Sequence, residues 1–365
     1  MEPEVRRPPA RFHEIDLLRF VAALSVVLYH YTFRNYAAGH YSPIPPSPLS
    51  AATKYGFLGV QLFFIISGYV MLLSAQGKTV RQFFVSRAAR LYPAFWVACT
   101  LTFLTKLLWG TGGADAHMAP ELAAVPWWQY AFNLTMLPEF FGVPALDGVY
   151  WSLTVEITFY FLVSLLLGYR LLHRLDWCLA GWLLYAALPG RFRLASPFAT
   201  LLLPAYAPYF AAGMLFFLLQ QPGGRRWHRL ALLLLAYVLA VRSALDYSVF
   251  LTRYLHGDYS RPLVVGLVTG CFLVFGLLTL RLVSLRPRPW LRVAGALTYP
   301  LYLLHNDIAS VAFHRLYGPV SGGWLLATAL ALMLGAAYLV HVLAERPLSQ
   351  WLRQKLPGWL RYFDA

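Results

Sequence analysis

The sequence predicts an all-α integral membrane protein with about ten transmembrane helices in one domain. Three observations support this class. Hydrophobic residues make up 59% of the 365 residues and charged residues only 12%, which is too apolar for an ordinary soluble protein. Apolar runs of bilayer-spanning length recur along the chain. Cations are concentrated in alternate connections between these runs, as positive-inside topology requires.

The expected spans are taken from the apolar runs in chain order. They lie at 15–34, 55–75, 91–109, 150–169, 175–189, 197–219, 229–245, 262–282, 291–313 and 323–343. The fifth run is shorter than the roughly 20 residues that a full crossing needs. The first run carries Asp16 and Arg19, and no small-residue cleavage site follows it. We therefore expect a retained first span and not a cleaved signal peptide.

The distribution of cations predicts the orientation. With a cytoplasmic N-terminus, 20 of the 30 Lys and Arg residues fall in inner segments, 8 in outer segments and 2 within spans. Both termini are then cytoplasmic, and the segment Gly110–Val149, which has no Lys or Arg, lies outside. This bias explains most of the formal net charge of +15, so we expect the lipid bilayer as a partner and no nucleic acid.

The chain divides into a cytoplasmic N-terminal tail (1–14), a membrane domain (15–345) and a cytoplasmic amphipathic C-terminal tail (346–365). Cys99, Cys178 and Cys271 lie singly in apolar runs. Their spacing indicates neither a disulfide framework nor a metal site.

The first span, "DLLRFVAALSVVLYHYTF", contains ionisable residues that are costly in a membrane. Arg19 and His30 are separated by three turns plus about 20°, so they project from one helix face about 16 Å apart. Asp16 and Arg19 are either a boundary ion pair or part of a site. His30 is either a hydrogen-bonded interfacial histidine or a functional one.

The fourth span, "GVYWSLTVEITFYF", contains Glu156 about two turns from its outer end. Ser152, Glu156 and Tyr160 are spaced i, i+4, i+8 and share a face. His30 lies at a similar depth, so we expect that the two can meet in the outer leaflet. The alternative is that Glu156 only bonds a neighbouring helix.

Two further stretches carry polar side chains into spans. Arg87 and Arg90 in "RQFFVSRAARLYPAFW" either anchor the helix at anionic headgroups or bind a phosphorylated cytoplasmic ligand. Tyr302, His305 and Asn306 in "LTYPLYLLHNDIA" predict a cavity in the ninth span, with Tyr302 and Asn306 on one face.

Together these stretches resemble the membrane-bound acyltransferase family 3, whose members O-acylate polysaccharides, lipids and antibiotics. The matching motifs are "IDLLRFVAALSVVLYH", "FFIISGYVM", "SRAARLYPAFW", "YWSLTVEITFYF" and "LTYPLYLLH". They occur in order over about residues 12 to 347. One departure is that Leu17 and Phe20 stand where the family commonly has glycines in the first motif.

The resemblance implies a cytosolic acyl-CoA donor, most commonly acetyl-CoA, and no permanently bound cofactor. Arg19, Arg87 and Arg90 would hold the donor's phosphates. His30 would act as base or acyl acceptor, assisted by Glu156. Candidates for binding the substrate or the oxyanion are Ser152, Tyr302, His305 and Asn306.

The expected function is O-acetylation of an envelope or exported polysaccharide, or of its lipid-linked precursor, in a bacterial cytoplasmic membrane. Polysaccharide assembly machinery is an expected partner. The enzyme alternative is acylation of a small hydroxylated product such as a macrolide. Proton-coupled transport is the main rival, because it also needs ionisable groups inside spans. A non-catalytic membrane subunit is the third class.

Overall fold

The computed structural model describes residues 12–39, 41–110, 119, 122–190, 199–222, 226–318 and 320–361. Parts of several expected features lie outside these ranges. They are residues 1–11 and 362–365 of the two tails, part of the loop 110–149, residues 197 and 198 of the sixth span, and six cations of the charge count: Arg6, Arg7, Arg11, Arg191, Arg193 and Arg225.

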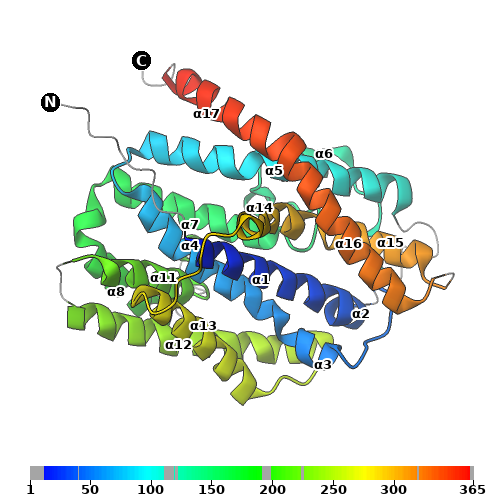
Figure 1. Cartoon of the computed structure of the whole chain (residues 1–365), viewed down its shortest axis with the longest axis horizontal. Helices are drawn as coiled ribbons and strands as arrows, with labels where there is room; N and C mark the ends of the chain where they lie inside the picture. The colour runs from blue at the N-terminus through cyan, green and yellow to red at the C-terminus, as the bar shows by residue number, and fades with distance from the viewer. Residues whose placement is uncertain are drawn as a thin grey trace.

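The regular elements of the described ranges are helices (Figure 1). In chain order they are α1 (His13–Tyr29), the π-helical turn η1 (His30–Arg34), α2 (Asn35–Ala37), α3 (Ser50–Thr53), η2 (Lys54–Phe57), α4 (Leu58–Ala75), α5 (Val80–Trp109), α6 (Trp127–Asn133), η5 (Pro138–Phe141), α7 (Trp151–Gly168), η6 (Leu171–Arg174), α8 (Leu175–Ala187), α10 (Ala199–Leu202), α11 (Ala207–Gln220), α12 (Arg226–Leu255), α13 (Arg261–Thr279), α14 (Pro289–Leu304), α15 (Asp307–Leu316), α16 (Gly322–Val340), the π-helical turn η7 (His341–Glu345) and α17 (Arg346–Arg361).

Seven helical segments of the described chain are long and apolar enough to cross a bilayer. They are His13–Ala37, Ser50–Ala75, Val80–Trp109, Trp151–Gly168, Arg226–Leu255, Arg261–Thr279 and Gly322–Gly358. Each corresponds to one of the ten expected spans. The protein is therefore polytopic and all-α, as predicted.

The other three expected spans form shorter helices. The fifth is α8, with 13 residues, and the sixth is α11, with 14 residues. The ninth is divided into α14 and α15 at His305 and Asn306. These two residues lie in the polar stretch for which the sequence predicts a cavity.

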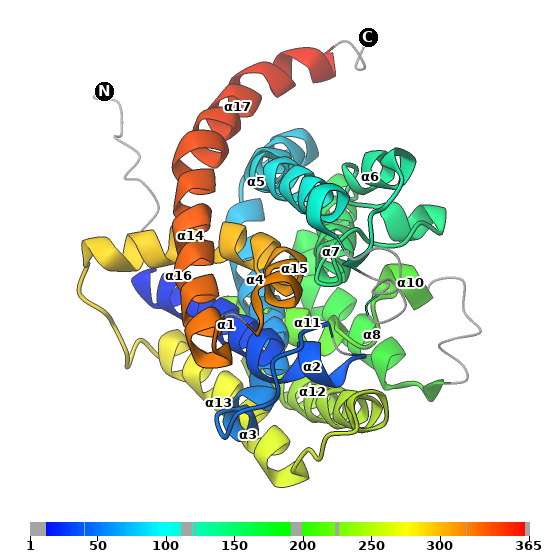
Figure 2. The same cartoon turned by 90° about the vertical axis from the view of Figure 1, so that its right-hand side faces the viewer.

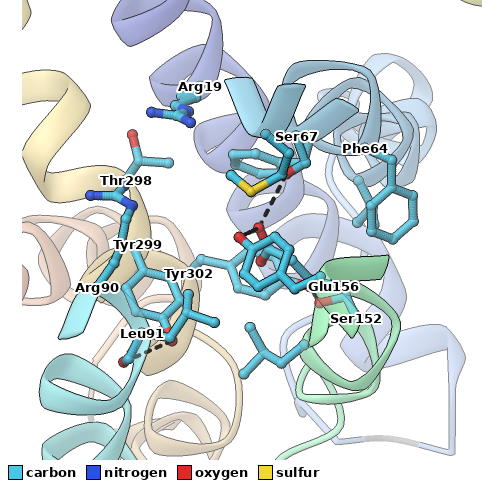
Figure 3. Close-up of a pocket in the computed structure, with 15 residues that line it drawn as sticks. Arg19, Phe64, Ser67, Arg90, Leu91, Ser152, Glu156, Thr298, Tyr299 and Tyr302 are labelled. Atoms are coloured by element: carbon cyan, nitrogen blue, oxygen red, sulfur yellow. Dashed lines mark hydrogen bonds between the residues drawn. The ribbon is translucent and has the colours of Figure 1, made fainter. Parts of the chain in front are cut away.

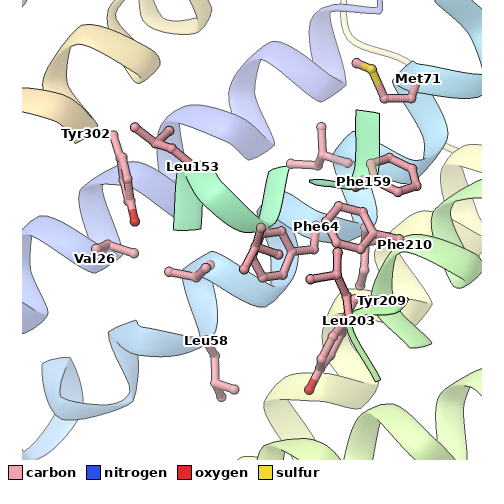
Figure 4. Close-up of a cluster of buried hydrophobic side chains, with 14 of the residues drawn as sticks. Val26, Leu58, Phe64, Met71, Leu153, Phe159, Leu203, Tyr209, Phe210 and Tyr302 are labelled. Atoms are coloured by element: carbon pink, nitrogen blue, oxygen red, sulfur yellow. The ribbon is translucent and has the colours of Figure 1, made fainter. Parts of the chain in front are cut away.

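Helix α4 lies at the centre of the bundle (Figures 1 and 2). It packs most extensively against α11, and glycine permits the close approach. A Cβ atom on Gly68 would stand 2.1 Å from the carbonyl oxygen of Phe210. Beside this crossing, the ring of Phe210 stacks on Phe159 of α7 at 4.0 Å between centroids and contacts Phe64 of α4 (Figure 4). The core thus joins α4, α7 and α11.

Helix α1 packs against α14, and α17 packs against α5. The carboxylate of Asp16 lies against Gly295 of α14, where a Cβ atom would stand 2.5 Å from an Asp16 oxygen. The guanidinium of Arg81 in α5 donates to the carbonyl of Pro357 in α17. These contacts join α1 to α14 and α5 to α17.

Candidate active site

An open cavity of about 860 Å³ lies between α1, α5, α14 and the start of α17. We call it the arginine vestibule. Its charged lining residues are Arg19, Arg90, Arg292, Arg346, Asp16 and Glu345. Glu345 is already paired, through its Oε2, with His341 Nδ1 at 2.7 Å. The excess of guanidinium groups favours an anionic ligand.

Positive charge continues along the same end of α5. Lys78 lies in the turn between α4 and α5, near Arg87 and Arg353. Burial lowers the pKa of Lys78 from its usual value, and the charges of these two arginines lower it further. A group of cations at one end of a helix attracts phosphate groups.

A second, narrower cavity of about 80 Å³ lies deeper in the bundle (Figure 3). We call it the inner pocket. Arg19 and Arg90 line both the vestibule and this pocket, so the two spaces meet at these arginines. Figure 3 shows Glu156 and Ser152 across the pocket from Arg19 and Arg90. Tyr302 of α14 also contributes to the lining.

Glu156 lies in the wall of the inner pocket on α7. Ser67 Oγ of α4 donates to Glu156 Oε1 at 3.1 Å, and the hydroxyl of Tyr160 donates to the same oxygen. Ser152 and Tyr160 line the pocket together with Glu156, so the face predicted from their spacing is present. The carboxylate therefore lines the inner pocket and has hydrogen-bond partners from two helices.

The predicted arginine pair of α5 separates in the structure. Arg90 lines both cavities. Arg87 instead donates to Ser86 Oγ at 3.0 Å and lies over the rings of Phe83 and Tyr160, 5.9 Å from each centroid. Arg87 therefore places a positive charge next to Tyr160, which lines the inner pocket, but does not line either cavity itself.

Two hydroxyl groups meet at another side of the inner pocket. Ser152 Oγ lies 2.7 Å from the hydroxyl oxygen of Tyr302, and both hydroxyls are within 3.2 Å of the carbonyl oxygen of Val149. Because the Val149 carbonyl can only accept hydrogen bonds, it competes with the neighbouring hydroxyl oxygen for the protons of Ser152 and Tyr302. Tyr302 also contacts His305, at 5.6 Å between ring centroids.

His30 and His305 are hydrogen-bonded to each other. The distance from His30 Nδ1 to His305 Nε2 is 3.0 Å. His30 Nδ1 also lies 2.9 Å from the carbonyl oxygen of Val26, and His305 Nδ1 lies 2.8 Å from that of Tyr302.

A buried polar cluster holds the break between α14 and α15. Asn306 Nδ2 and the backbone N–H of Asp307 each donate to Asp147, both at 3.0 Å. Lys106 Nζ lies 2.6 Å from Asp307 Oδ2. Asn35, at the end of η1, donates to Asn306 Oδ1 at 3.2 Å. We call these five residues the polar clamp. It ties the turn that carries His30 to the break that carries His305.

Two expectations about contacts are corrected. The described hydrogen bonds of Glu156 go to Ser67 and Tyr160, and the side-chain partner of His30 is His305. The expected pairing of His30 with Glu156 is therefore not what the structure has, because Glu156 faces α4 across the inner pocket. Asn306 does not share a pocket-lining face with Tyr302, because the helix ends between them.

Sequence reasoning missed Asn35, Asp147 and the role of Lys106. Lys106 carried a signal, since a lone cation inside a span normally has a buried partner. Asp147 lies in a loop whose sequence gives no such signal. Its importance depends on contacts with Asn306 and Asp307, far along the chain.

A family model described as an acyltransferase domain, that of acyltransferase 3, matches residues 12–353. The chain belongs to the acyltransferase 3 family. This membership identifies it as a membrane O-acyltransferase, and it decides for the enzyme over the transporter.

Family relatives come from several bacteria. Acyltransferase MdmB of Streptomyces mycarofaciens is 27% identical over 98% of this chain and 95% of its own length. Nodulation protein 10 of Rhizobium leguminosarum bv. viciae is 28% identical over 84% of this chain and 85% of its own. Peptidoglycan O-acetyltransferase OatA of Listeria monocytogenes is 28% identical over 40% of this chain and 22% of its own. No solved structure matches the chain.

Proposed function

We propose that the protein transfers an acetyl group from cytosolic acetyl-CoA across a bacterial inner membrane to a hydroxyl group of an envelope or exported polysaccharide, or of its lipid-linked precursor. The observation that supports the proposal is a series of polar groups that begins at the two cavities and ends at the histidine pair. Arg19 and Arg90 line both the arginine vestibule and the inner pocket, and Tyr302 connects that pocket with His305 and His30.

The arginine vestibule suits the phosphate groups of acyl-CoA. Guanidinium groups bind phosphate oxygens in a bidentate way, and the volume of about 860 Å³ is typical of a small-molecule site. Arg87, together with Lys78, adds positive potential beside it. We orient this end of the bundle toward the cytoplasm, because the excess of cations in the sequence favours that side.

The inner pocket suits the pantetheine arm. It is the smaller of the two cavities, at about 80 Å³, and a slender chain suits it better than a bulky group. The arm's reach is comparable to the roughly 16 Å between Arg19 and His30 along a helix, so the thioester arrives near His30. Glu156 faces this route and offers a hydrogen-bond acceptor to the amide N–H groups of the arm.

Two chemical routes use His30. In the first, Nε2 removes the proton of the acceptor hydroxyl, which attacks the thioester. In the second, Nε2 attacks the thioester and forms an acyl-histidine, from which the acyl group passes to the acceptor. The hydroxyls of Ser152 and Tyr302 are candidates for stabilising the oxyanion in either route.

A glycan acceptor is supported by the relative named as a peptidoglycan O-acetyltransferase, and machinery that assembles such a glycan is then the natural partner. The alternative acceptor is a small hydroxylated product such as a macrolide. Acyltransferase MdmB matches over 95% of its own length, but its name states no acceptor, so this match favours neither class of acceptor.

The test uses purified protein in nanodiscs with radiolabelled acetyl-CoA. Separate reactions contain an envelope glycan fraction from the host, a macrolide, or no acceptor. We expect label on the glycan, and its loss in His30→Ala. The matched control is His173→Ala, because His173 is exposed in η6 and its loss should leave transfer unchanged. Label on the macrolide alone would favour the alternative acceptor, and equal transfer by His30→Ala would contradict the proposal.

A further inference from the structure

We propose that His305 is a positioning residue that shares the proton of His30 during acyl transfer, so that the reaction uses a pair of imidazoles and not a single histidine. The inference rests on the proposed catalytic role of His30. It is carried by the 3.0 Å contact between His30 Nδ1 and His305 Nε2, and by the carbonyl that each Nδ1 faces.

The two histidines are buried to different degrees. His305 is fully buried, whereas 7% of the His30 side chain and backbone surface is accessible. Because His305 has no accessible surface, we assign to His30 the contact with the acceptor hydroxyl. The single Nδ1–H of His30 is shared between the Val26 carbonyl and His305 Nε2. In the neutral form of His30, this leaves the Nε2 lone pair unused within the pair.

This arrangement gives the proton balance of the first route, in which the acceptor hydroxyl attacks the thioester directly. His30 Nε2 takes the proton of the acceptor hydroxyl as the new acyl–oxygen bond forms, and His30 becomes an imidazolium. Its Nδ1–H then donates to His305 Nε2, which spreads the charge over two rings. When the carbon–sulfur bond breaks, His30 Nε2 returns the proton to the departing thiolate. The acyl group moves from sulfur to oxygen, and no further reactant is required.

The polar clamp keeps the two rings at this distance. The backbone N–H of Asn35 donates to the carbonyl of His30, so Asn35 closes the turn that begins with His30. The side chain of Asn35 donates to Asn306, the residue after His305, and to Ser310 at 2.8 Å. Asn35 and Asn306 are both fully buried. One set of side chains therefore positions both imidazoles.

The test compares His305→Gln, which retains a hydrogen-bond acceptor, with His305→Phe, which retains a ring but has none. We expect His305→Phe to lower kcat by about 10- to 100-fold, the effect of losing a hydrogen bond to a charged group, with little change in KM for acetyl-CoA. His305→Gln should recover part of kcat. Should His305→Phe not yield folded protein, His305→Leu replaces it.

A packing role for His305 predicts the opposite order, with the ring-retaining Phe variant more active than the Gln variant, and that result would overturn the inference. So would full kcat in His305→Phe while His30→Ala is inactive, a result that leaves the proposed function standing. An active His30→Ala would instead overturn the proposed role of His30, and the inference with it.

Discussion

His30 stands at the first residue of a π-helical turn, and such turns are frequent at functional sites. The carbonyl oxygen of Val26 faces both the backbone N–H and the Nδ1 of His30. Two other ionisable residues of the first span, Asp16 and Arg19, both line the arginine vestibule.

At the residue scale, Arg90 is, together with Arg19, a cation that lines both cavities. We predict that Arg90→Gln raises KM for acetyl-CoA about tenfold or more with a smaller effect on kcat, since phosphate binding contributes equally to ground and transition states. The control is Arg174→Gln, an exposed arginine of η6. Steady-state kinetics at varied acetyl-CoA concentration measures the effect. Similar KM values in the two variants would contradict this role for Arg90.

The sequence predicted several residues of the site but did not predict which residues they contact. Charged and polar side chains inside apolar runs predicted His30, Arg19, Arg90 and Glu156 as candidates, because such residues are costly unless they have a partner or line a cavity. Their partners were not predictable. His305 is 275 positions from His30, and nothing in either motif indicates that they meet.

At the element scale, the decisive feature is the break between α14 and α15. Hydropathy predicted one continuous ninth span, which the structure divides. It predicted seven other spans correctly, because a long apolar run in a bilayer is stable only as a helix. The break depends on Lys106 and Asp147, which satisfy polar groups far away in sequence. A local pattern does not contain that information.

We predict that Lys106→Met destabilises the protein by about 3–5 kcal/mol, because Asp307 is left as an uncompensated buried charge. Lys106 and Asp307 have exposed fractions of 3% and 1%. The double variant Lys106→Met/Asp307→Leu should recover part of this loss, since both charges are then absent. Thermal unfolding in detergent measures both variants. A double variant less stable than Lys106→Met would contradict the expected compensation.

At the scale of the whole molecule, α1 connects the two ends of the proposed reaction path. Arg19 lies at the junction of the two cavities, and His30 follows Tyr29, the last residue of the same helix. Composition and cation distribution predicted the membrane class and an orientation. The cavities themselves arise from packing between α1, α4, α5, α7 and α14, which the sequence of any one helix cannot predict.

The central claim is that the acyl group crosses the membrane within this protein. The most direct measurement uses proteoliposomes with radiolabelled acetyl-CoA on the side of the arginine vestibule and host envelope glycan only on the opposite side. We predict that labelled glycan accumulates with the wild-type protein and not with His30→Ala, while intact acetyl-CoA stays on its own side. Label that reaches the glycan only when acetyl-CoA is on the glycan's side would contradict the account.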